Sequence, residues 1–150
     1  MDEETPAMAD TPKHSVSVAG IVVDEDDRVL VIQRRDNAHW EPPGGILELD
    51  ESPEDGVCRE VFEETGVSVA VEELSGVYKN MTRGIIALVF RCRRVSGEPT
   101  VSDESRAVAW RSIGEIVDDM DPAFAIRVQD ALSREVYVRC HDGVELVGSD

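Results

Sequence analysis

Three glutamates on one predicted helix are the residues in this sequence best suited to chemistry. Glu60, Glu63 and Glu64 occupy positions i, i+3 and i+4 of the segment 53–65. At about 100° per residue, their carboxylates fall within roughly one third of the helix circumference and repel one another. A divalent cation removes that repulsion, and hard oxygen ligands suit Mg²⁺ or Mn²⁺. Because an acidic stripe alone is more often a solvated helix face, the surrounding residues must decide.

The helix that carries these glutamates has clear predicted ends. Ser52 is a good N-cap, Pro53 occupies a first-turn position where a missing N–H costs nothing, and Asp55 lies three residues after the cap. Gly66 supplies the left-handed residue that commonly ends a helix. The side of the helix away from the glutamates is apolar and is predicted to pack against a core; it comprises Val57, Cys58, Val61 and Phe62.

The residues around the glutamates follow a family pattern. From Gly45, five residues lead to Glu51 and seven more lead to Arg59, which opens the run Arg-Glu-Val-Phe-Glu-Glu-Thr-Gly-Val. This order resembles the Nudix box position for position: glycine, five residues, glutamate, seven residues, Arg-Glu, an aliphatic, any residue, Glu-Glu, any residue, glycine, an aliphatic. Flanking features extend the resemblance over about residues 15–134; they are Gln33-Arg34-Arg35, Trp40, Pro43-Gly44-Gly45, and Trp110 before a short helical turn.

The resemblance implies an α+β fold, an α/β/α sandwich with a mixed central sheet and the box as a loop–helix–loop. It also implies metal binding by the last three box glutamates and the carbonyl of the first glycine, which correspond here to Glu60, Glu63, Glu64 and Gly44. Arg59 would hold Glu51 in place. Paired metal ions would bridge two phosphates and hold the attacking water. The general base is either a box glutamate, Glu63 or Glu64, or an acidic residue of the loop Asp103-Glu104.

The net charge of −17 bounds the partners. It argues against nucleic acid or an anionic membrane, and an anionic nucleotide needs a local basic region. The candidates for contact with the substrate are Arg34, Arg35, Lys79 and Arg83, with Arg35 at the place where MutT-type members keep a phosphate-contacting arginine. Trp40 could stack on a base, although packing is favoured. The histidines His39 and His141 are expected at the surface, because neither has a partner at metal-site spacing.

Periodicity and turn signals divide the chain into a short acidic leader at 1–13 and a single domain at 14–150. Strands are expected near 16–23, 29–32, 68–78, 84–93 and 106–110, with helices at 53–65 and 122–133 and a hairpin at 136–147. The segment 85–90 is apolar enough for a central strand. Three widely spaced cysteines and the lack of an apolar span or signal segment indicate a cytoplasmic protein with reduced thiols. A homodimer is possible through the hairpin.

The predicted function is metal-dependent hydrolysis of a phosphoanhydride bond in a nucleoside diphosphate linked to another moiety, with a nucleoside triphosphate as the favoured substrate. Two alternatives remain. A nucleotide-sensing protein without catalysis would usually have lost box glutamates, which are intact here. An isoprenoid-diphosphate isomerase would need a cysteine near its substrate, whereas Cys58 and Cys92 are expected on buried faces.

Overall fold

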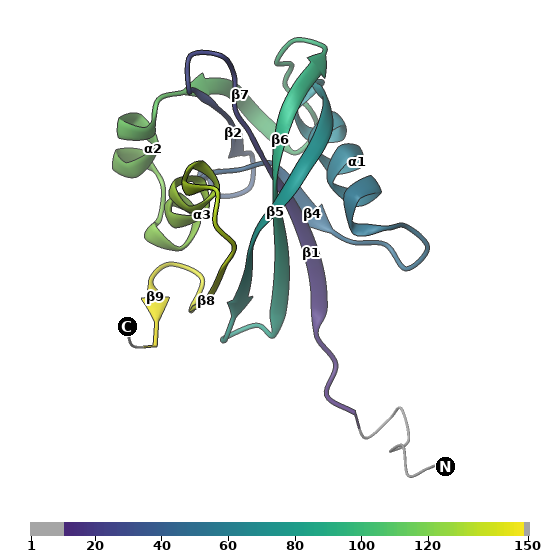
Figure 1. Cartoon of the computed structure of the whole chain (residues 1–150), viewed down its shortest axis with the longest axis vertical. Coiled ribbons are helices and arrows are strands. Elements are labelled where there is room, and N and C mark those ends of the chain that lie inside the picture. Colours follow the sequence, from purple (N-terminus) through teal and green to yellow (C-terminus); the bar gives the residue numbers. More distant parts are fainter. Residues whose placement is uncertain (1–10, 149–150) are drawn as a thin grey trace.

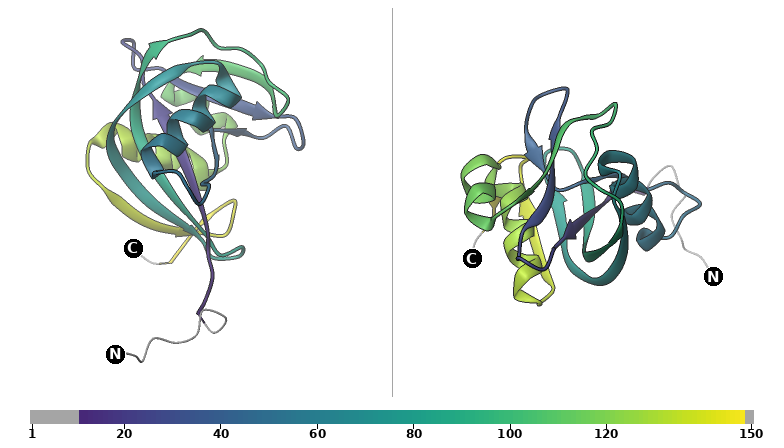
Figure 2. Two further views of the ribbon diagram at one scale, coloured as in Figure 1. Left: turned by 90° about the vertical axis from the view of Figure 1, so that its right-hand side faces the viewer. Right: turned by 90° about the horizontal axis from the view of Figure 1, so that it is seen from above.

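The chain folds as a three-layer sandwich (Figure 1). The structure is a computed structural model and describes residues 11–148. Most of the predicted leader falls on residues 1–10, outside the described residues. Helix α1 (Pro53–Thr65) covers one side of the strands, and α2 (Ile113–Asp119) and α3 (Pro122–Ser133) cover the other, as the view from above shows (Figure 2). The predicted α/β/α sandwich is confirmed.

The strands form two sheets. A six-stranded sheet has the order β4-β1-β6-β5-β8-β9, and a three-stranded sheet has the order β3-β2-β7. The larger sheet is mixed, because β1 pairs with β6 and β5 pairs with β8 in parallel while the other pairs are antiparallel. The strands are β1 (Ser15–Val22), β2 (Val29–Arg34), β3 (Trp40–Glu41), β4 (Gly44–Ile46), β5 (Ser68–Asn80), β6 (Ile85–Ser96), β7 (Ser105–Arg111), β8 (Tyr137–His141) and β9 (Leu146–Val147).

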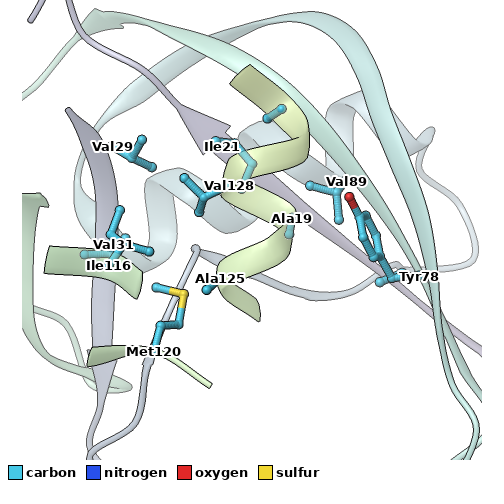
Figure 3. Close-up of a cluster of buried hydrophobic side chains, with 12 residues drawn as sticks. Ala19, Ile21, Val29, Val31, Tyr78, Val89, Ile116, Met120, Ala125 and Val128 are labelled. Atoms are coloured by element: carbon cyan, nitrogen blue, oxygen red, sulfur yellow. The ribbon is translucent and has the colours of Figure 1, made fainter. Parts of the chain in front are cut away.

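The side chains of β1 alternate between two hydrophobic cores, one on each face of the strand. Val18 and Val22 pack toward α1, whereas Ala19 and Ile21 pack toward α3. The core under α3 gathers residues from β1, β2, β5, β6 and both later helices (Figure 3). Because both faces of these strands are buried, apolar residues follow one another along β1, β2 and β6 with few polar residues between them.

Most elements lie where the sequence places them, and the differences have physical reasons. The predicted hairpin is present as β8 and β9, with Cys140 opposite Val147 and His141 opposite Leu146. Strands β3 and β4 were not predicted, and their segment was expected to be a loop. Strands of two or three residues are too short to show a recognisable pattern of alternation. Helix α2 was expected only as a short helical turn. Phe62, expected to pack, is 55% exposed.

Helix α1 has the ends that its sequence predicts. The Ser52 hydroxyl accepts a hydrogen bond from the Asp55 N–H, and Gly66 adopts φ 77° at the C-cap, where its N–H bonds to the Phe62 carbonyl. Val57 and Val61 are fully buried against the sheet. This packing fixes the rotation of the helix and turns its glutamates toward the edge strand β4. None of the helices in residues 11–148 is long and apolar enough to span a membrane.

Candidate active site

Glu64 joins α1 to the edge strand β4. The Gly44 N–H donates a hydrogen bond of 2.9 Å to Glu64 Oε1, and the Glu64 side chain is buried. Burial raises the pKa of Glu64 to about 8 against the lowering effect of that hydrogen bond, and repulsion from Glu60, Glu104 and Glu41 raises it further. A carboxylate held in this way gains strongly from any cation placed beside it.

Glu60 lies against the same strand. A Cβ atom at Gly45 would lie 2.5 Å from the Glu60 carboxyl carbon, so only glycine leaves room for this side chain. Burial raises the pKa of Glu60, although a hydrogen bond from Arg59 partly offsets the effect. Gly45 is therefore required by the Glu60 carboxylate, whereas Gly44 is required by the close approach of the β1 backbone at Val18 and Ala19.

Arg59 organises the acidic residues of the box. Its Nη2 and Nε atoms hold the two oxygens of Glu51 at 2.6 and 2.9 Å, which is the bidentate pairing typical of arginine and carboxylate. Its Nη1 atom contacts Glu60 Oε2 at 2.9 Å and Glu63 Oε1 at 3.2 Å. The contact of Arg59 with Glu51 expected from the sequence is thus present. The Arg59 hydrogen bond lowers the pKa of Glu51.

Glu104 reaches this cluster from another sheet. It lies just before β7, and its charge raises the pKa of both Glu60 and Glu64. Its backbone carbonyl accepts a 3.0 Å hydrogen bond from the Arg35 N–H, which fixes the loop 102–104 beside β2. Of the candidate general bases, Glu63, Asp103 and Glu104 are exposed, whereas Glu64 is buried.

The oxygen atoms at this site are suitable ligands for a hard divalent cation. The Gly20 N–H bonds to the Pro43 carbonyl, and the Leu47 N–H bonds to the Val16 carbonyl. Because hydrogen-bonded positions alternate along an antiparallel pair, the backbone N–H and carbonyl of Gly44 both point away from β1. Its carbonyl therefore faces the same side as its N–H, which binds Glu64. A backbone carbonyl and several carboxylates are the ligands that Mg²⁺ and Mn²⁺ prefer.

The side chains are nevertheless not gathered around one point. Within residues 11–148, no three acidic, histidine or cysteine side chains are placed to hold a metal ion as they stand. The reason is visible at Arg59, whose Nη1 atom takes an oxygen of both Glu60 and Glu63. Binding of a cation by the three box glutamates requires these two side chains to turn from Arg59 toward Gly44.

A cleft of about 560 Å³ opens on the other side of β4. It lies on the α3 side of the large sheet, and its walls come from β1, β4, β5, β6, α3 and the turn after β8. Gly44 and Gly45 line the cleft and also touch the α1 carboxylates. The edge strand β4 therefore separates the acidic cluster from the cleft by the thickness of one backbone.

The structure divides the candidate substrate-contacting residues into two groups. Arg34 and Arg83 line the cleft. The other three do not line it. Arg35 Nε donates a hydrogen bond to the Ser102 carbonyl at 2.9 Å. Tyr78 lines the cleft, so the side chain of Lys79, the next residue on β5, points to the opposite face of the strand. Trp40 packs against the core with the Arg111 guanidinium 4.3 Å above its ring. Packing, the favoured prediction for Trp40, is confirmed.

Three cleft residues were not anticipated in these roles. Glu41 ends β3, pairs with Arg34 Nη1 at 3.6 Å, and has its pKa raised by burial. Arg127 of α3 is buried, and its Nη2 atom lies 3.2 Å from His141 Nε2. His141 is only 2% exposed, so the expectation of a surface histidine is wrong. His141 is buried because β8 pairs with β5 and ends beside Arg127 of α3, an arrangement that local spacing could not reveal.

The cysteines do not face the cleft. Cys58, Cys92 and Cys140 are free thiols, and none of them lines the cleft. Burial raises the pKa of Cys92 to about 12 and also raises that of Cys58, so both are held as thiols. This arrangement argues against the isomerase alternative, which needs a cysteine at the substrate.

Comparison with known proteins agrees with the fold and identifies the family. The family model described as NUDIX domain matches residues 13–135. A MutT-like protein of Streptomyces ambofaciens is 58% identical over 137 residues, which cover 91% of this chain and 89% of that protein. The chain therefore belongs to the Nudix family of hydrolases, and it is a pyrophosphohydrolase.

Other relatives carry names that point to different substrates. An ADP-ribose pyrophosphatase of Methanocaldococcus jannaschii is 34% identical, with 68% of this chain and 64% of that protein covered. An 8-oxo-dGTP diphosphatase of Escherichia coli is 33% identical, with 69% and 85% covered. The crystal structure of a MutT protein from Methanosarcina mazei has a TM-score of 0.70 at 26% identity, and the match covers 81% of this chain and 96% of that one.

Proposed function

We propose that this chain hydrolyses the phosphoanhydride bond of a nucleoside triphosphate with the help of Mg²⁺ or Mn²⁺. The observation that carries the proposal is the position of the Gly44–Gly45 edge, which contacts buried carboxylates of α1 and lines a cleft of about 560 Å³. That volume is typical of sites for small molecules, about 300–1,000 Å³. A phosphate chain that enters the cleft along β4 lies directly beside the acidic cluster.

In this proposal, Glu60, Glu63, Glu64 and the Gly44 carbonyl hold the cation. A bound divalent cation would neutralise the phosphate charge and supply a nucleophilic water at neutral pH. Arg59 positions the glutamates through its pairing with Glu51. Arg34 and Arg83 contact phosphate oxygens from the cleft wall. The cation and these arginines together offset the negative charge that the acidic chain places near the phosphates.

We propose Glu104 as the general base in preference to Glu63. The Glu63 carboxylate is paired with Arg59, whereas no ion pair or side-chain hydrogen bond of the Glu104 carboxylate is present among residues 11–148. Glu104 also approaches the acidic cluster from the loop before β7, close enough for its charge to raise the pKa of Glu60 and of Glu64. The water oxygen bonds to phosphorus as its proton passes to Glu104, and the bridging P–O bond breaks with its electrons leaving on the departing phosphate group.

The triphosphate assignment is supported by the relative named 8-oxo-dGTP diphosphatase, while the relative named ADP-ribose pyrophosphatase defines the competing substrate. Hydrolysis of nucleoside triphosphates, ADP-ribose and dinucleoside polyphosphates should be compared at equal concentration with Mg²⁺ and with Mn²⁺. A triphosphate is expected to have the highest kcat/KM. Preference for ADP-ribose over every triphosphate would refute the substrate assignment, and no hydrolysis of any compound would refute the activity.

We also propose a cytoplasmic location, which is supported by the three free cysteines. A homodimer through the β8–β9 hairpin is a further proposal, supported by exposed apolar side chains on and beside it, which include Val136, Val138, Leu146 and Val147. Light scattering of the wild type and of Val138→Lys tests it. A monomeric wild type would exclude the dimer.

A further inference from the structure

Arg127 is a buried arginine that no carboxylate of the described residues holds by a hydrogen bond or ion pair, although the charge of Glu41 acts on it at longer range. Its side chain lines the cleft, the residue is 7% exposed, and no ion pair to it is present among residues 11–148. Burying a guanidinium costs free energy unless its hydrogen bonds are satisfied. The Arg127 Nε atom is buried and has no hydrogen-bond partner in this part of the chain.

Other arginines of the protein show how such a group is normally satisfied. Arg34, Arg59 and Arg139 each use Nε and Nη2 to hold both oxygens of one carboxylate. In Arg127 the Nε and Nη2 edge meets no carboxylate. The Tyr78 and Phe124 rings lie 5.0 and 4.7 Å from its guanidinium carbon, so they occupy its faces. Only the edge of the guanidinium remains for hydrogen bonds.

His141 faces donors on two sides. The Gly143 N–H donates to His141 Nδ1 at 2.9 Å, and Arg127 Nη2 lies 3.2 Å from His141 Nε2. A neutral imidazole has one acceptor nitrogen, while a backbone N–H and a guanidinium can only donate. Whichever tautomer is present, one of these two contacts therefore sets two donors against each other. An acceptor from outside the protein would satisfy the donors that meet at Arg127 and His141.

The surroundings favour a neutral acceptor on a flat ring over an anion. Glu41 and Asp142 line the cleft close enough for their charges to act on Arg127 and His141, so they would repel a negative charge added between these two residues. Tyr78, Phe124, Ile85 and Ala87 contribute an apolar and aromatic wall. A heterocycle with a carbonyl oxygen offers such an acceptor in its plane, and the pairing of arginine with adjacent oxygen and nitrogen acceptors of guanine is a known bidentate contact.

We propose that Arg127 and His141 form a specificity-determining subsite that selects a nucleobase with a carbonyl edge over one with an amino group at that edge. The inference rests on the proposed function, since it assigns the part of the nucleotide that lies away from the phosphates. Hypoxanthine and adenine nucleotides are the matched probes, because their purines differ at position 6 in carbonyl or amino character. An amino group would add a further donor to a place already crowded with donors.

The test compares binding of IMP and AMP by calorimetry and hydrolysis of ITP and ATP with Mg²⁺. Wild type is expected to bind IMP at least about tenfold more tightly than AMP and to cleave ITP with a similar advantage in kcat/KM. Arg127→Lys keeps the charge but removes the planar edge, so the preference should fall to about twofold or less. Arg93→Lys, on an exposed part of β6, is the matched control and should retain the preference.

His141→Asn serves as a second variant, because its amide oxygen can still accept from Gly143 while the ring N–H is lost. Circular dichroism establishes that each variant is folded. Equal affinity of wild type for IMP and AMP, undetectable binding of IMP, or an unchanged preference in both folded variants would overturn the inference. So would Arg127-dependent binding of inorganic phosphate with no preference between the bases. Selective binding of IMP without hydrolysis of any triphosphate would instead refute the proposed function and leave the subsite standing.

Discussion

The Gly44 N–H and Glu64 Oε1, 2.9 Å apart, connect the cleft wall to the acidic face of α1. The strand that lines the cleft and the helix that carries the glutamates therefore cannot move independently. The neighbouring Gly45 also couples β4 to α1, because the absence of a Cβ atom there leaves space for the Glu60 carboxylate. Substitutions at these two glycines should separate catalysis from stability.

Gly45→Ala should lower activity more than stability. The added Cβ would lie 2.5 Å from the Glu60 carboxyl carbon, so this flexible side chain must move away from β4. A displacement of about 1 Å at a catalytic group can cost on the order of 100-fold in rate. Gly44→Ala is the comparison, because its Cβ would meet the Val18 backbone oxygen and should cost about 1–3 kcal/mol of stability. Thermal unfolding and kcat/KM of both variants check this; equal melting temperatures would contradict it.

Glu64→Gln should abolish most activity and leave the fold intact. The amide is isosteric and neutral, so it can still accept from Gly44 while removing a charge that is costly to bury. The loss in kcat should be about 10²–10⁴-fold, and calorimetry should detect weaker binding of Mg²⁺. Glu54→Gln on the exposed first turn of α1 is the control and should match wild type. Wild-type activity in Glu64→Gln would remove this glutamate from the site.

Arg59→Lys should fail to replace arginine. Lysine cannot hold both Glu51 oxygens and also reach Glu60 and Glu63, because it lacks the planar fork. Loss of a group that orients metal ligands typically costs about 10–100-fold in activity or metal affinity. Activity measured against Mg²⁺ concentration should show a raised metal requirement. An Arg59→Lys enzyme with an unchanged requirement would show that the pairing with Glu51 is only structural.

The parts of this protein that could be predicted from sequence are those that local residues determine. The N-cap, the glycine stop and the glutamate spacing of α1 all lie within one segment, and the helix begins and ends where they indicate. The β3 and β4 strands could not be predicted, because their two or three residues become strands only through pairing with β2 and β1. Phe62 is exposed because it lies beside the buried stripe of α1, which runs along Val57, Val61 and Thr65.

The cleft was beyond local reasoning for a similar cause. Arg127 and His141 come from α3 and β8, and neither element alone indicates that its polar residue points inward. Glu104 was identified only as one of several possible bases, beside Glu63, Glu64 and Asp103, and its nearness to Glu64 depends on the pairing of β7 with β2. Helix α1 can thus be predicted from its own sequence, whereas the cleft is assembled from distant segments.

Stability should fall in mild acid because of His141. Burial and the nearby Arg127 charge lower the pKa of this histidine below its ordinary value of 6.5, against a smaller opposite effect of Asp142. As the pH drops below about 6.5, the unfolded chain therefore binds a proton at this position before the folded protein does. The free energy of unfolding decreases through that window until the pH reaches the lower, folded pKa, and each unit of depression costs about 1.4 kcal/mol. His141→Asn has no group that titrates there, so urea denaturation from pH 7.5 to pH 5 should show wild type losing stability relative to the variant. If stability falls equally with pH in the two proteins, the imidazole is protonated as readily in the folded state as in the unfolded chain. The crowding of hydrogen-bond donors around His141 would then be relieved in solution.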